Sequence, residues 1–121
     1  MQNFGGEMTF ALSTGDRIVV RGAAEIMPSN VNIEGNANQD GSIYRTVEPT
    51  GFKANLTFED MAADDWNRLM RASGFNVTLN ESFTGAQHLW TEAAFTGTPT
   101  INRATGEVTG VALIARAYKK I

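Results

Sequence analysis

A strict alternation of apolar and polar residues over residues 51–59 constrains the fold more than any other feature of the chain. Successive side chains of a β-strand point to opposite faces, so this spacing matches an extended segment. The residues expected on the buried face are Phe52, Ala54, Leu56 and Phe58. One buried and one solvated face is typical of strands in antiparallel sheets, so the pattern predicts that class of sheet.

Further runs of apolar alternation or β-branched residues predict strands over residues 8–12, 17–21, 31–34, 75–80, 87–95 and 107–117. Residues 13–16, Ser-Thr-Gly-Asp, are typical of a hairpin turn between the first two strands. Gly97, Pro99 and Gly106 punctuate the chain before the last strand, where we expect a long connection. The chain is therefore expected to be mainly β and antiparallel.

One segment has helical spacing, and it follows the 51–59 strand. Asp60 is the expected N-cap, and Asp64 and Asp65 place negative charge near the start of the helix. Gly74 is expected just past its end. The apolar stripe that should pack on the core consists of Ala62, Trp66, Leu69 and Met70. Trp90, in a predicted strand, is expected either in the core or at an interface.

The composition fits one folded domain spanning residues 1–121, with 42% hydrophobic residues. A net charge of −3 argues against general binding to nucleic acid or anionic membranes, which needs a basic surface. The chain has no cysteine, which excludes disulfides and thiolate chemistry. The first residues lack the pattern of a secretory signal, and no apolar run reaches the roughly 20 residues that cross a bilayer. We therefore expect folding in a reducing cytoplasm, without membrane insertion.

Chemistry-bearing residues are sparse. His88 is the only histidine and lacks the partners of a typical zinc site, and the carboxylate pairs at 59–60 and 64–65 are explained by the start of the helix. Residues 36–41, Asn-Ala-Asn-Gln-Asp-Gly, partly match a calcium loop, but its twelfth position is Val47 and the glutamate follows one residue late. No phosphate-binding glycine loop or nucleophile elbow is present. We expect no catalytic, metal or cofactor site and no enzymatic activity.

Residues 35–50 differ from their surroundings and are expected to form a long loop. The segment 35–42 is polar and flexible in character, whereas Ile43, Tyr44 and Val47 are apolar residues among turn formers. Loops of this length in a small domain are either functional or disordered. Contact with another molecule and ordinary local packing are therefore both open interpretations.

The order of these elements and three stretches of sequence resemble the tail tube proteins of Mu-like contractile phages. The stretches are Gly-Phe-Lys-Ala-Asn-Leu-Thr-Phe-Glu-Asp at 51–60, Asp-Asp-Trp-Asn-Arg-Leu at 64–69 and Asn-Arg-Ala-Thr-Gly-Glu-Val-Thr-Gly-Val at 102–111. The resemblance covers residues 8–118 and rests on structural motifs rather than a catalytic signature. It implies an antiparallel β-sandwich or barrel with one flanking α-helix, a fold shared with other phage tail tubes and with the type VI secretion tube.

The resemblance also implies a function. Six subunits would close into a ring, and rings would stack into a hollow tube inside a contractile sheath, through which viral DNA passes without specific binding. The implied partners are further copies of the chain, the tail sheath protein, and the baseplate, initiator and terminator proteins of the tube. The implied location is the virion tail, after assembly in the host cytoplasm. An acidic chain suits such a conduit, because a wall with few basic groups would not retain a polyanion.

By analogy with the family, three regions become candidate sites. The 35–50 loop would reach a neighbouring subunit or ring, and the terminal segments 2–6 and 118–121 would act as arms. The candidate contact residues are Phe4, Ile43, Tyr44, Val47, Tyr118 and Ile121. The candidate lumen residues, all uncharged, are Asn76, Thr78 and Asn80.

Two other classes of protein remain open. One is a tube or tube-terminating protein of the same fold in a tailocin or a type VI-like injection machine, which genomic neighbours such as a sheath gene would distinguish. The other is a monomeric ligand-binding β-barrel, which needs an apolar internal cavity and no self-assembly. The sequence leaves open the host, the lumen charge, the sheath contact surface, the stacking geometry and the state before assembly.

Overall fold

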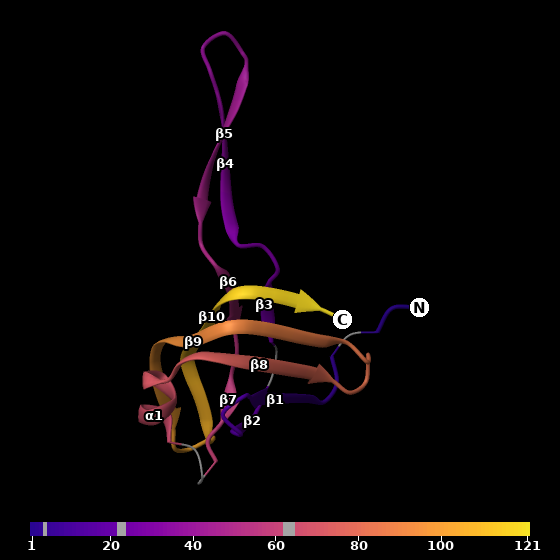
Figure 1. Ribbon diagram of the computed structural model, residues 1–121, viewed down its shortest axis with the longest axis vertical. Helices are drawn as coiled ribbons and strands as arrows, with labels where there is room; N and C mark the ends of the chain where they lie inside the picture. Colours follow the sequence, from indigo (N-terminus) through magenta and orange to yellow (C-terminus); the bar gives the residue numbers. More distant parts are fainter. Residues whose placement is uncertain (4, 22–23, 62–64) are drawn as a thin grey trace.

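The computed structural model describes residues 1–121 except residues 4, 22–23 and 62–64. The described residues form ten strands and one short helix (Figure 1). In chain order these are β1 (Met8–Leu12), β2 (Arg17–Val19), β3 (Glu25–Met27), β4 (Val31–Ala37), β5 (Ile43–Pro49), β6 (Phe52–Asn55), β7 (Phe58–Glu59), α1 (Trp66–Arg71), β8 (Ser73–Glu81), β9 (Gln87–Asn102) and β10 (Glu107–Lys120).

Most strands belong to one antiparallel sheet in the order β2-β1-β8-β9-β10-β6-β3, and β7 pairs with the other end of β10. The sheet folds over on itself, so that the chain after β2 meets β7 through a bridge between Val20 and Phe58. Beside that bridge, the Arg21 amide donates to the Thr57 carbonyl over 2.8 Å. The layers enclose a core without closing a barrel. The predicted mainly β, antiparallel fold with one flanking helix is confirmed in its sandwich form.

The core between the layers is dominated by aromatic rings. The ring of Phe58 lies 5.1 Å from that of Phe10 and 5.4 Å from that of Trp66, between centroids. The ring of Phe95 lies 6.2 Å from Phe58 and 5.4 Å from Phe75. All five side chains are buried. Such tilted and edge-on contacts suit the charge distribution of aromatic rings and stabilise the core beyond simple area burial.

The alternation over residues 51–59 predicts the buried face correctly but not the strand pairing. Ala54, Leu56 and Phe58 are buried, and Phe52 packs half-buried against the core. The segment nevertheless forms two strands, because β6 pairs with residues 112–115 of β10 and β7 pairs with residues 107–108. The chain steps away from β10 between them, next to a shift in the β9–β10 register.

The helix begins later than the sequence predicts. Its first residue is Trp66, and its N-cap is Asp65, whose carboxylate accepts a hydrogen bond from the Arg68 amide at 3.3 Å. Asp60 is not the cap, because it forms an ion pair with Arg103 at 2.6 Å. Asp65 caps the helix because it directly precedes Trp66, whose burial in the core fixes where the first turn starts.

The apolar stripe of the helix packs inward. Trp66 and Leu69 are buried, and Met70 is half-buried against the core. Gly74 does not follow the helix end as predicted, because it lies inside β8. Two further residues of the predicted helix, Ala62 and Asp64, lie outside the described residues.

β9 and β10 form a long hairpin in place of the predicted long connection. β9 continues through Gly97 and Pro99 to residue 102 and leaves only a tight turn over residues 103–106. Gly97 and Gly110 lie near each other with φ of 92° and 80°. A Cβ on Gly97 would collide with the Gly110 carbonyl oxygen, and one on Gly110 would collide with the Thr98 carbonyl oxygen. The two glycines therefore allow the backbones of β9 and β10 to approach each other closely at a bend, and both strands continue past them.

β4 and β5 form a separate two-stranded hairpin that projects from the body (Figure 1). The prediction of a loop over residues 35–50 is therefore wrong. The strand predicted at 31–34 extends to residue 37 and pairs along its whole length with residues 43–49. We call residues 31–49 the arm. A seven-residue strand at about 3.3 Å per residue makes it roughly 20 Å long.

Candidate assembly surface

The arm has an apolar face and a polar face, and every residue of its two strands is exposed. Residues that pair directly across an antiparallel ladder lie on the same side. The apolar face consists of the pairs Val31–Pro49, Ile33–Val47, Gly35–Arg45 and Ala37–Ile43. The polar face consists of the pairs Asn32–Glu48, Glu34–Thr46 and Asn36–Tyr44.

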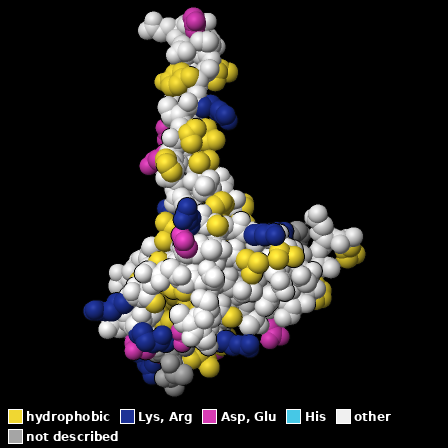
Figure 2. All heavy atoms as spheres, viewed as in Figure 1, with side chains coloured by type: hydrophobic (Ala, Val, Ile, Leu, Met, Phe, Trp, Pro, Cys, Tyr) yellow, Lys and Arg dark blue, Asp and Glu magenta, His cyan; other side chains and the backbone are white. Residues whose placement is uncertain are grey.

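The apolar face leaves large aliphatic side chains in water. Ile43 is 79% exposed, Val47 57% and Ile33 44%. Figure 2 shows hydrophobic groups spaced along the arm. A two-stranded hairpin is marginally stable by itself, because it has no core to bury, and contiguous exposed apolar surface marks contact sites. The arm therefore has the properties of an element that another molecule completes.

The tip of the arm uses its polar groups to close the turn. The Asn38 amide donates to the Ser42 carbonyl over 2.7 Å. The amide and hydroxyl of Ser42 both donate to Oδ1 of Asp40, over 2.9 and 2.6 Å, and these bonds hold the pKa of Asp40 below its usual value. The segment that partly matches a calcium loop thus forms an Asx-type turn, in which the Asp40 carboxylate accepts from Ser42. Among the described residues, no three His, Cys, Asp or Glu side chains are placed to hold a metal ion.

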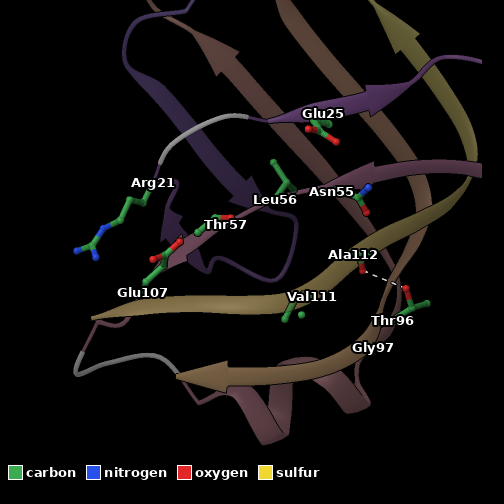
Figure 3. Close-up of a pocket in the computed structure, with 11 residues that line it drawn as sticks. Arg21, Glu25, Asn55, Leu56, Thr57, Thr96, Gly97, Glu107, Val111 and Ala112 are labelled. Carbon is green, nitrogen blue, oxygen red and sulfur yellow. Dashed lines mark hydrogen bonds between the residues drawn. The ribbon is translucent and has the colours of Figure 1, made fainter. Parts of the chain in front are cut away.

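A cleft of about 680 Å³ opens on the body where the chain steps between β6 and β7 (Figure 3). Its walls include Glu25, Leu56, Thr96, Glu107, Val111 and Ala112. Arg21 also lines it, but its guanidinium is paired with Glu59 at 2.7 Å. In the described part of the chain, Glu25 and Glu107 form no ion pair. The cleft therefore combines apolar walls with two uncompensated carboxylates.

His88 is a core residue rather than an accessible one, with 6% of its surface exposed. Its Nδ1 lies 2.6 Å from the Tyr118 hydroxyl, and its Nε2 contacts the Glu81 carboxylate. The rings of Tyr118 and Trp90 stack on it, with centroids 5.9 and 6.0 Å away. Burial, together with the Glu81 charge, raises the pKa of Tyr118. Both ring nitrogens have partners, so the arrangement stabilises the sheet, and Trp90 belongs to the core.

Both ends of the chain lie on the side of the body away from α1 (Figure 1). Tyr118 is half-buried within β10, and Ile121 is 62% exposed. The Ile121 amide donates to the Gln87 carbonyl over 2.9 Å, so the last residues continue the sheet and do not form a free arm. Phe4 lies outside the described residues.

The candidate lumen residues share the outer face of β8. Asn76 is exposed, and Thr78 and Asn80 are half-buried. Their neighbours across the register in β1 and β9 are Thr9, Ala11, Gln87 and Leu89. None of these side chains carries a charge. In Figure 2, charged groups lie mainly around the margin of the body.

Sequence reasoning identified only part of the arm. It singled out Ile43 and Val47, which lie on the apolar face, and Tyr44, which lies on the polar face. It did not propose as contact residues four others on the apolar face, namely Val31, Ile33, Arg45 and Pro49. Apolar and polar residues alternate on both sides of the tip, over 31–37 and 43–49. This alternation indicates a common apolar face only if the two segments are assumed to pair as a hairpin.

A sandwich body with a projecting hairpin whose apolar face is uncovered is typical of subunits that assemble with other molecules. The chain matches the family model of phage tail tube proteins over residues 1–120. It belongs to the phage tail tube protein family, whose members are structural, self-associating components of the virion tail. A comparison with curated proteins found no match. In the described residues, no helix has the length and hydrophobicity to cross a membrane.

Proposed function

We propose that this chain is the subunit of a hollow tail tube, in which hexameric rings stack inside a contractile sheath and conduct viral DNA into the host. Each subunit contributes one domain, residues 1–121, and assembly takes place in the host cytoplasm before the virion is complete. The sheath protein and the baseplate, initiator and terminator proteins are the further partners. The match over residues 1–120 and the Mu-like sequence stretches support this assignment.

The single observation that carries the proposal is the uncovered apolar face of the arm. Completing the burial of a partly exposed Val or Ile side chain contributes about 1 kcal/mol. The arm has four such side chains, which together contribute about 4 kcal/mol: Val31, Ile33, Ile43 and Val47. Bringing two molecules together costs about 4–15 kcal/mol, so one arm contact does not hold a pair of subunits. In a stack of rings each subunit donates one arm contact to the next ring and receives another, so the contacts between two rings form together and assembly is cooperative. The subunit should therefore stay monomeric until a baseplate presents a template.

The outer face of β8 is the proposed wall of the lumen, with Asn76, Thr78 and Asn80 directed at the transported DNA. The strip over β1, β8 and β9 is uncharged, and Arg17 of β2 and Lys119 of β10 flank it in register. An uncharged strip suits transit, because phosphates bind strongly only where Lys and Arg gather. Amide and hydroxyl side chains carry no charge, so they offer a polyanion no ionic partner.

The test is electron microscopy and solution mass of the purified protein, with and without a baseplate nucleus. Replacing both Ile33 and Val47 with Asp should abolish tubes and leave a folded monomer. The matched control replaces Asn32 and Thr46 with Asp, on the same two strands but on the polar face, and should still assemble. Wild-type protein that forms neither rings nor tubes on a nucleus would contradict the proposal.

A ligand-binding barrel is not favoured, because the sheet does not close. A tailocin or type VI-like machine would use the same subunit geometry. Recovery of tubes from DNA-filled particles would separate the phage assignment from these empty injection machines.

A further inference from the structure

Arg45 is the one charged residue on the apolar face of the arm. It lies opposite Gly35, which has no side chain to shield the arginine stem. In the part of the chain that the structure describes, its guanidinium forms no ion pair. When this face docks, Arg45 is buried with the aliphatic residues beside it, and a buried charge without a partner is strongly destabilising. The surface that receives the arm must therefore supply carboxylates together with apolar contacts.

The cleft between β3, β6 and β10 offers that combination. Leu56, Val111 and Ala112 supply apolar surface, while Glu25 on β3 and Glu107 on β10 supply carboxylates from different elements (Figure 3). A volume of about 680 Å³ is in the range of pockets that hold whole small molecules, so it has room for several side chains. The charges are complementary, since one unpaired cation meets two unpaired anions.

The arm cannot reach the cleft of its own chain. Glu25 pairs with Asn55 at the cleft end of β3 and β6, whereas Met27 pairs with Lys53 at the end that leads into the arm. The arm and the cleft therefore lie at opposite ends of the same two strands, and Figure 1 shows the arm extending away from the body. A contact between the arm of one copy and the cleft of another is head-to-tail, which generates a filament when it does not close.

We propose that the apolar face of the arm enters this cleft on a second copy, with Arg45 between Glu25 and Glu107, and that this contact stacks successive rings. The inference rests on the proposed tube function, because it assumes stacked copies of the chain. The cleft is then the surface that receives the arm, and the charge of Arg45 makes the arm specific for it.

Charge reversal with complementation in trans tests the contact. The variants are Arg45→Glu and the double variant Glu25→Lys with Glu107→Lys, each checked for folding by circular dichroism and thermal unfolding. Each alone should require at least tenfold more protein than wild type to form tubes on a nucleus, because like charges then meet in the cleft. An equimolar mixture should assemble near the wild-type concentration, since each arm then finds a cleft of opposite charge. The matched control, Glu34→Lys on the polar face, should assemble like wild type.

The outcomes separate this inference from the tube function. Tubes of Arg45→Glu at the wild-type concentration, or a mixture no better than either variant alone, would overturn the arm–cleft contact while leaving the tube function intact. Failure of the wild type to form tubes on a nucleus would overturn both. A second measurement uses the absence of cysteine in the chain. Introducing Arg45→Cys and Glu107→Cys together should yield disulfide-linked ladders from assembled tubes, and only monomers would again refute the contact.

Discussion

Replacing Gly97 with alanine tests whether the close approach of β9 and β10 shapes the body. The native φ of 92° is one that L-residues avoid, which costs about 1–2 kcal/mol. Alanine also lowers the conformational entropy of the unfolded chain, which offsets about 0.4–1 kcal/mol of that cost. The new methyl group would also overlap the Gly110 carbonyl oxygen, and forced overpacking costs about 1–3 kcal/mol more. Together these effects lower the unfolding free energy by about 1–5 kcal/mol, with a midpoint of about 3 kcal/mol.

Gly15→Ala is the matched control for this prediction. Gly15 has a φ of 96°, but a Cβ there would meet nothing within 4 Å. Only the net backbone cost applies, which is about 0–1.6 kcal/mol. Urea unfolding followed by tryptophan fluorescence measures both variants, since Trp66 and Trp90 are buried. If Gly97→Ala and Gly15→Ala differ by less than about 0.5 kcal/mol, the close contact does not constrain the fold and the reasoning fails.

Two further changes probe the core and the buried polar cluster. Phe58→Ala removes a fully buried ring and should lower the unfolding free energy by about 3–5 kcal/mol. Phe83→Ala, at a side chain 66% exposed, should change it by less than about 0.5 kcal/mol, and equal losses would disprove the described core. Burial raises the pKa of Tyr118 above its unfolded value of 10.0, so its contribution to stability is complete below that pH and is lost as pH rises through the folded pKa. Urea titrations should show a steeper loss of stability above pH 10 for the wild type than for Tyr118→Phe, and parallel profiles would exclude this effect.

Local patterns in the sequence sufficed for most of the body. Alternation placed Ala54, Leu56 and Phe58 on the buried face, and helical spacing placed Trp66 and Leu69 against the core. These predictions succeed because a side chain's face is set by the backbone period of its own element. The same logic identified a mainly β, antiparallel fold without knowledge of which strands pair.

The errors occurred where a residue type has two physical uses. We expect Gly97 to end a strand, but its positive φ also suits a bend within one. Asp60 was expected to cap the helix, yet a carboxylate beside Arg103 forms an ion pair just as well. Sequence spacing cannot choose between such uses, since the choice depends on a partner that lies far away along the chain.

From the sequence alone follow most of the extended segments of the body, the phase of their apolar side chains and the lack of cysteine chemistry. Only the folded chain shows that residues 31–49 form an arm and not a loop, that its apolar face is left uncovered, and that Glu25 and Glu107 line one cleft. The physical reason is that periodicity reports which face of a strand is apolar but not what covers it. In the body, the apolar face of a strand is buried by residues that lie far away along the chain. In the arm, it can be buried only by the surface of another molecule.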